Sequence, residues 1–179
     1  MNRSGMGPAV AALVAPVILA AGCETPSAET TVSVLTYNIW HDQEDWPARL
    51  EAMVPGLQAA SPDILCLQEV LQNPELPNQA ATLAERLGYH HYFASWDSAG
   101  SAKRYGNAIL TRAPVIDSGF RLLDPQEDYR VVARVRVDPG TGPVDVYCTH
   151  LHHTQERPDM RRAQIEGVIH FIEETDSPG

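Results

Sequence analysis

Three polar residues each follow a largely apolar run of the sequence, and their side chains could act together on one substrate. They are Asn38, Glu69 and His150. Strands of one sheet that end in polar residues place them along one rim, where layered α/β proteins keep their sites. The carboxylate of Glu69 and the carboxamide of Asn38 offer hard oxygen ligands, which suit Mg²⁺, Mn²⁺ or Ca²⁺ better than zinc. The imidazole of His150 can donate a hydrogen bond to a phosphoryl oxygen or assist proton transfer. The three residues together predict a metal-assisted site that stabilises an anionic phosphoryl transition state.

Each of these residues also has a purely structural interpretation. Glu69 can end a strand and face water, Asn38 can cap the following turn, and His150 can be a hydrogen-bonded histidine near the core. A zinc site is a further alternative, because His150 and His152 would point to the same face of a strand. The longer pattern His-x-His-x-Asp-His is absent, since Thr154 stands where its Asp would be. A structural zinc site also normally takes four ligands.

Apolar periodicity and turn signals predict the elements that must position these side chains. Six runs are predicted as strands, at residues 32–40, 63–70, 89–96, 106–112, 130–137 and 143–151. Three segments are predicted as helices, beginning at Trp46, Pro77 and Pro158, and residues 114–128 as an irregular connection. This mixture of hairpins and crossovers indicates an α+β, layered α/β domain in which helices cover the sheet faces.

Local signals predict the ends and the buried faces of the helices. Asp45 can cap the first helix, whereas Pro55 should kink or shorten it. Gly88 should end the second helix. The buried face of the last helix is predicted to consist of Ile165, Val168, Ile169 and Ile172.

The composition is that of one globular domain of ordinary size. The chain has 179 residues, a formal net charge of −10 and 44% hydrophobic residues, which excludes a wholly disordered chain. Three cysteines cannot make a disulfide-dense scaffold in a chain of this length. Cys66 and Cys148 lie in apolar runs and are predicted to be buried thiols, with a disulfide between them left open. The acidic balance argues against a general nucleic-acid coat protein, but not against an enzyme with a small basic cleft.

Residues 1–22 are predicted to be a signal peptide. Arg3 is the only charge before an apolar run from Ala9 to Ala21, which is too short to cross a bilayer comfortably. The small residues before Cys23 resemble a bacterial lipobox and predict lipidation of this cysteine. Residues 23–31 are then a tether. The predicted location is extracytoplasmic, as a membrane-anchored lipoprotein or, alternatively, as a secreted or periplasmic protein.

Four short motifs occur in order along the rest of the chain. They are Leu-Thr-Tyr-Asn-Ile-Trp at 35–40, Pro-Asp-Ile-Leu-Cys-Leu-Gln-Glu-Val at 62–70, Tyr-Gly-Asn-Ala-Ile-Leu-Thr-Arg at 105–112 and Cys-Thr-His-Leu at 148–151. This order resembles the endonuclease/exonuclease/phosphatase superfamily, which has the deoxyribonuclease-I-like fold. The resemblance covers Val32 to about Ile172. It implies an α/β sandwich, four-layered in the complete family domain, of which residues 32–179 would be the N-terminal part.

The resemblance implies a role for each matching residue. Glu69 would be the ligand of a divalent metal, Mg²⁺ or else Mn²⁺ or Ca²⁺, and Asn38 would help to hold the metal and this Glu. His150 would face the scissile phosphate as a catalytic residue. Asn107 would lie near the cleft and contact substrate, unless it serves only as a turn residue. Arg130 would either reach a phosphate, which its guanidinium geometry suits, or remain a solvated strand end.

The Gly-Asp-x-Asn and Ser-Asp-His segments of that superfamily have no match in the chain. The second segment supplies the Asp–His pair that activates water, and loss of a general base alone costs roughly 10²–10⁴ in rate. We therefore expect little or no activity from the chain by itself.

The implied function is a metal-dependent phosphoesterase that hydrolyses phosphodiesters or phosphomonoesters and contacts the membrane through its lipid anchor. Its substrate would be nucleic acid, a phospholipid headgroup or a small phosphoester. The alternatives are a non-catalytic surface lipoprotein that binds a partner through the same fold, and a His-x-His zinc-binding protein. The sequence indicates no specific protein partner.

Overall fold

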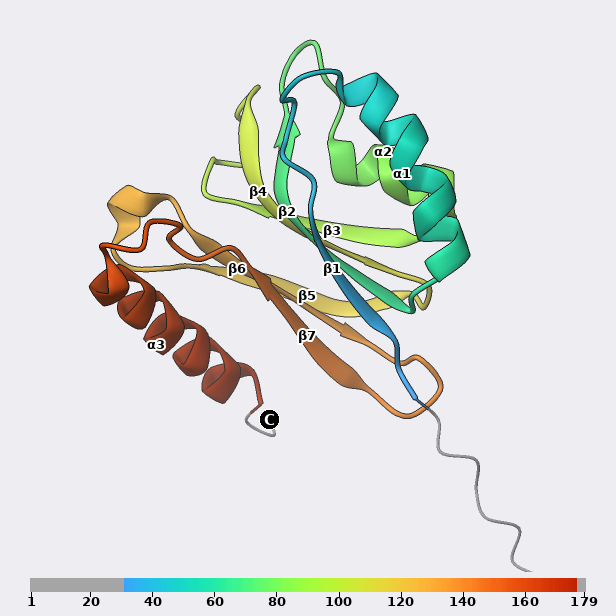
Figure 1. Ribbon diagram of the computed structural model, residues 1–179. Coiled ribbons are helices and arrows are strands. Elements are labelled where there is room, and N and C mark those ends of the chain that lie inside the picture. The colour runs from blue at the N-terminus through green and yellow to red at the C-terminus, as the bar shows by residue number, and fades with distance from the viewer. Residues whose placement is uncertain (1–30, 177–179) are drawn as a thin grey trace, which may run out of the picture.

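The structure is a computed structural model that describes residues 31–176 (Figure 1). The predicted signal peptide, the lipidation site Cys23 and all of the predicted tether except Thr31 lie outside the described residues. Between residues 31 and 176, none of the helices combines the length and the apolar character that a membrane span requires.

The described chain forms two sheets and three α-helices. The elements are β1 (Val34–Asn38), α1 (Trp46–Ala60), β2 (Ile64–Gln72), α2 (Gln79–Leu87), β3 (His90–Ser95), β4 (Arg104–Thr111), β5 (Val115–Leu122), the 3-10 helix η1 (Gln126–Asp128), β6 (Val131–Val137), β7 (Val144–Thr149) and α3 (Pro158–Thr175). The first sheet has the order β1-β2-β4-β3 and the second the order β5-β6-β7. Only β1 and β2 pair in parallel among these strands.

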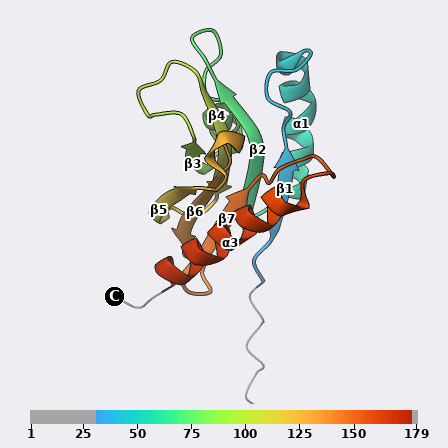
Figure 2. The same ribbon diagram turned by 90° about the vertical axis from the view of Figure 1, so that its left-hand side faces the viewer.

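Four layers result from the way these elements bury their apolar faces. Helices α1 and α2 pack on the outer face of the first sheet, where Leu50 and Leu83 meet Leu67. The two sheets face each other across a second core that includes Ile109 and Val135. Helix α3 covers the second sheet on the opposite side of the molecule from α1 and α2 (Figures 1 and 2). This layered α/β sandwich confirms the predicted fold class.

The helix ends predicted at Asp45 and Gly88 are confirmed, whereas the second helix begins at Gln79 and not at Pro77. The predicted effect of Pro55 is wrong. Asp45 caps α1 by accepting a hydrogen bond from Ala48 N at 3.0 Å. Gly88 ends α2 in the left-handed conformation, with φ +73°. Helix α1 continues through Pro55 to Ala60. Pro55 lies on the exposed side of the helix, so water can solvate the carbonyl that loses its hydrogen bond there.

The segment 114–128, predicted to be irregular, contains the strand β5. Half of its residues are exposed, and its pairing with β6 shifts register between Val115 and Asp117. Polar and apolar residues therefore do not alternate clearly along it. Pairing with β6, a contact remote in sequence, therefore decides its conformation.

The predicted buried face of α3 is also wrong in part. Ile165, Ile169 and Ile172 are 46%, 49% and 36% exposed. The helix instead buries Met160, Gln164 and Phe171. The inner side of α3 contains Gly167, where an added Cβ would lie 3.1 Å from Leu123 Cδ2. Because glycine has no side chain, the helix can pack closely against Leu123 at this position. A search for apolar periodicity does not detect a contact of this kind.

Candidate functional site

A bulge in β2 directs the side chain of Glu69 toward the other sheet. The pairing of β2 with β4 shifts register between Leu67 and Val70, and Glu69 has a left-handed backbone with φ +59°. Such bulges re-aim side chains, and strained backbone of this kind concentrates at functional sites. The carboxylate Oε1 of Glu69 lies 3.9 Å from Nδ1 of His150, which follows β7 in the second sheet. The bulge thus places the carboxylate of Glu69 where the ends of the two sheets meet.

Asn38 holds the carboxylate of Glu69 in place. Its Nδ2 donates to Glu69 Oε1 at 2.9 Å, while its Oδ1 accepts from Trp40 N at 2.8 Å. With both ends of the amide engaged, the orientation of Asn38 is fixed and one lone pair of the carboxylate is occupied. The structure thus gives Asn38 a positioning role toward Glu69, whereas direct ligation of a metal by Asn38 stays a prediction.

His150 faces a guanidinium as well as a carboxylate. Its Nδ1 lies 3.2 Å from Nη1 of Arg130, and its side chain is 24% exposed. Burial and the positive charge of Arg130 lower the pKa of His150, which favours the neutral imidazole. Because a guanidinium can only donate, Nδ1 must accept and Nε2 must carry the proton. The imidazole therefore has an N–H donor available on the side away from Arg130.

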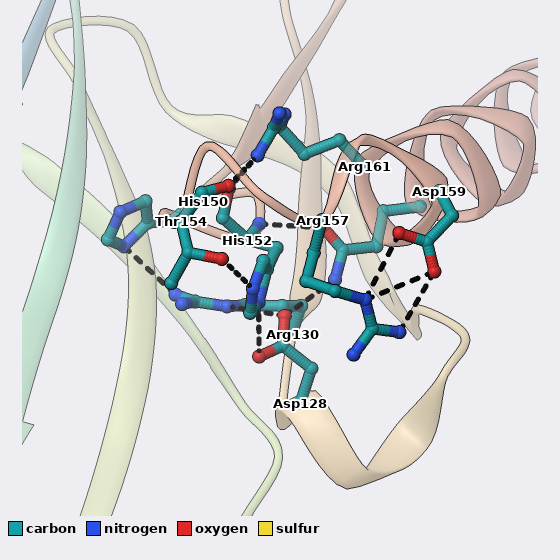
Figure 3. Close-up of polar contacts among 9 residues, drawn as sticks. Asp128, Arg130, His150, His152, Thr154, Arg157, Asp159 and Arg161 are labelled. Carbon is teal, nitrogen blue, oxygen red and sulfur yellow. Dashed lines mark hydrogen bonds and ion pairs between the residues drawn. The ribbon is translucent and has the colours of Figure 1, made fainter.

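Arg130 is held by a half-buried carboxylate (Figure 3). Its Nε donates to Oδ2 of Asp128 at 3.2 Å, and both side chains are 13% exposed. Gln164 Nε2 donates to the same oxygen at 2.7 Å, and His152 Nδ1 lies 2.9 Å from Asp128 Oδ1. Burial alone would raise the pKa of Asp128, but its hydrogen bonds to His152 and Gln164, the charge of Arg130 and the hydrogen bond from Arg130 together lower it. The structure thus excludes the solvated strand end considered for Arg130.

Asp128 is a site residue that the sequence reasoning missed. It belongs to η1, within the segment predicted to be irregular, so no strand pattern pointed to it. An acidic residue two positions before Arg130 is the signal that could have indicated the pair.

His152 is part of this network and does not pair with His150. Its Nδ1 faces Asp128 and its Nε2 lies 2.9 Å from Thr154 Oγ1, so both ring nitrogens are engaged (Figure 3). Strand β7 ends at Thr149, and the two histidines therefore do not share a strand face. Within residues 31–176, no group of three or more His, Cys, Asp or Glu side chains is placed to hold a metal ion. The arrangement gives no support to a His-x-His zinc site.

Two residues of β4 line the space between the sheets. Asn107 is 3% exposed, and its Nδ2 donates to Val131 O at 2.8 Å, so it joins the sheets and is not a turn residue. It borders a small cavity together with Arg130 and His150. Tyr105, two positions earlier, borders the same cavity. Burial and then the charge of Glu69 raise the pKa of Tyr105 to about 12, which keeps its hydroxyl protonated.

Cys66 and Cys148 meet between the two sheets. Both are buried free thiols, as expected from the apolar runs that contain them. A hydrogen bond between the two thiols lowers the pKa of Cys66 and raises that of Cys148. Gln68 Nε2 donates to Cys148 Sγ at 3.4 Å. The pair thus links β2 to β7 close to the residues that precede Glu69 and His150.

Comparisons with known proteins agree with this architecture. Protein angel homolog 2 of Danio rerio is 30% identical over 135 residues, which are 70% of this chain and 24% of that protein. The truncated TDP2 of Caenorhabditis elegans superposes with a TM-score of 0.63 at 25% identity, over 83% of this chain and 58% of that one. An endonuclease/exonuclease/phosphatase family protein from Leptotrichia buccalis gives a TM-score of 0.64 at 15% identity, over 78% and 62% respectively.

The chain thus spans about a quarter of the length of angel homolog 2 and about three fifths of the two solved structures. A sequence profile of the Endonuclease/Exonuclease/phosphatase family matches residues 35–178, which include every residue of the site described above. The chain belongs to the endonuclease/exonuclease/phosphatase family.

Proposed function

We propose that this domain binds a divalent metal ion and a phosphate ester as part of a metal-dependent phosphoesterase. The family to which it belongs consists of hydrolases that act on phosphate esters. The observation that supports the proposal is the convergence of Glu69, His150 and Arg130 from two different sheets. A carboxylate and a guanidinium that both approach Nδ1 of one neutral imidazole suit a cation and a phosphate bound side by side.

The donor set fits a hard cation of the magnesium type. Mg²⁺ is usually held by one or two carboxylates while it keeps several waters and takes oxygens of the substrate phosphate. Glu69, oriented by Asn38, offers one such carboxylate beside His150, where the two sheets meet. Mg²⁺, or Mn²⁺ or Ca²⁺ in its place, would supply positive charge that polarises a phosphoryl oxygen.

The other two side chains would act on the phosphate directly. Arg130, fixed by Asp128, would direct its remaining N–H groups at phosphate oxygens, and His150 would donate from Nε2. Among residues 31–176, no carboxylate lies within hydrogen-bond distance of His150, whose Nδ1 faces Arg130 instead. Nothing in the described part of the chain thus prepares His150 as a general base, and the proposal is best tested by binding.

Export, lipidation and the class of substrate stay proposals that rest on the sequence. The predicted signal peptide and the lipidation site at Cys23 support a lipoprotein anchored outside the cytoplasm. The substrate would be a nucleic acid, a phospholipid headgroup or a small phosphoester.

The charge of Glu69 should decide whether the protein binds a divalent ion. Glu69→Gln keeps the size of the side chain and an oxygen for Asn38, but removes the negative charge that attracts the cation. Isothermal titration of the full chain with Mn²⁺ should show binding that weakens at least about tenfold in this variant. Glu51→Gln is the matched control, because Glu51 is an exposed carboxylate paired with Arg86 on the outer helices, and it should bind as the wild type does.

Two results would contradict the proposal. Zn²⁺ binding that disappears in His152→Ala but persists in Glu69→Gln would favour the zinc site. Absence of any divalent-ion binding would favour a non-catalytic binding module.

A further inference from the structure

An aromatic cavity lies beside the candidate site. Its volume is about 370 Å³, within the range of small-molecule sites. Its walls are formed by Trp96, Asp97, Lys103, Tyr105 and Tyr129. These residues come from the loop between β3 and β4, from the start of β4 and from the turn before β6.

The aromatic cavity adjoins the place proposed for the phosphate. Tyr105 and Tyr129 border both the aromatic cavity and the small cavity lined by Asn107, Arg130 and His150. Tyr129 directly precedes Arg130 in the chain. A ligand with its phosphate at Arg130 could therefore extend its remaining part past Tyr105 into the aromatic cavity.

The aromatic walls suit a flat ring. Trp96 and Tyr129 stand edge to face with ring centroids 5.5 Å apart, and Tyr129 is 62% exposed. Exposed aromatic side chains of this kind are stacking surfaces for bases, and they tolerate different base types.

Two polar side chains complete the cavity. Asp97 Oδ2 accepts from Tyr105 N at 2.8 Å and from Ser95 Oγ at 3.2 Å, which fixes the loop against β4. Its other oxygen, Oδ1, takes no hydrogen bond from the described residues and is free to accept one. Lys103, the only lysine in the chain, supplies ammonium donors at the same cavity. One donor and one acceptor at an aromatic wall match the edge of a nucleobase.

We propose that this cavity binds the base of a nucleotide whose phosphate contacts Arg130 and His150. The inference rests on the proposed function, because it uses the same phosphate position. A quaternary ammonium headgroup fits less well, because it offers neither an acceptor to Lys103 nor a donor to Asp97. A bare hydrocarbon chain would leave Lys103 and Asp97 without partners.

Titration calorimetry of the full chain in the presence of Mg²⁺ tests the inference with AMP and ribose 5-phosphate. AMP should bind about tenfold to a hundredfold more tightly, as expected for stacking of one base. Trp96→Ala should remove this preference and leave the affinity for ribose 5-phosphate unchanged, while Trp96→Phe should retain most of it. Phe120→Ala, which removes an exposed aromatic ring on β5, should change neither affinity. Arg130→Ala should weaken both ligands.

The outcomes separate the inference from the proposed function. Equal affinities for AMP and ribose 5-phosphate would overturn the base site while the phosphate site stands. Adenosine binding that depends on Trp96, with no binding of ribose 5-phosphate, would support the base site and contradict the phosphate site. Failure of all three ligands to bind would overturn both. Phosphocholine that binds more tightly than AMP and loses this advantage in Trp96→Ala would overturn the choice of a nucleobase.

Discussion

Replacing Asp128 with Ala should destabilise the domain by about 3 kcal/mol or more. The carboxylate is the shared hydrogen-bond partner of Arg130, His152 and Gln164. Its removal takes a hydrogen bond from each of these three buried or half-buried side chains. The loss should be measured as the change in the free energy of unfolding in urea. Asp159→Ala is the control, because Asp159 forms an exposed pair with Arg157 and its removal should leave the free energy of unfolding nearly unchanged.

The pH dependence of the stability of a second variant, Asp128→Asn, isolates the effect of the charge of Asp128. The folded-state pKa of Asp128 is lowered, so its ionisation stabilises the fold above the unfolded pKa of roughly 3.9. That contribution is lost as the pH falls through the lower folded-state pKa. Asp128→Asn should therefore be less stable than the wild type at pH 7, with a difference that shrinks on acidification below about pH 4. A difference of the same size at pH 7 and at pH 3 would contradict the role given to this carboxylate.

Gly106→Ala should destabilise the domain by about 3 kcal/mol, because the added methyl group has no space. A Cβ at Gly106 would lie 1.9 Å from the carbonyl oxygen of Ala94 on β3, and a backbone atom cannot move away as a flexible side chain can. The strain would fall between Tyr105 and Asn107, both of which border the site. Chemical unfolding should show the loss as a lower transition midpoint.

Gly56→Ala is the matched control for this change. It also adds one methyl group to a glycine, but nothing lies within 4 Å of the new Cβ on the exposed side of α1. The free energy of unfolding should rise by about 0.5–1 kcal/mol, because alanine loses less conformational freedom on folding than glycine does. Equal effects of the two substitutions would show that the close contact of β3 with β4 is not what requires Gly106.

The sequence predicted those parts of the fold whose signals are local. Continuous apolar runs gave the central strands, and Asp45 and Gly88 marked helix ends through interactions with their own neighbours. Strand β5 could not be predicted in this way, because its conformation depends on pairing with β6. The buried face of α3 was missed because Gly167, which has no apolar side chain, allows the contact with Leu123.

The same distinction between local and long-range signals applies to the residues of the candidate site. Asn38, Glu69 and His150 could be placed together from the sequence, because polar residues at strand ends share a rim. Tyr105 joins them through burial beside Glu69, which only the fold reveals. Asp128 joins them through its ion pair with Arg130. Its contacts with His152 and Gln164 depend on the loop after β7 and on α3, which are remote in sequence.

The central claim is that a divalent cation binds beside Glu69, where the two sheets meet. Paramagnetic broadening by Mn²⁺ in the amide NMR spectrum of the full chain tests it most directly, because the effect falls steeply with distance from the ion. We predict that substoichiometric Mn²⁺ broadens the amides of Asn38, Glu69 and His150 first, and that Glu69→Gln abolishes this pattern. Broadening centred on His152, or spread evenly over exposed carboxylates such as Glu51, would contradict the claim.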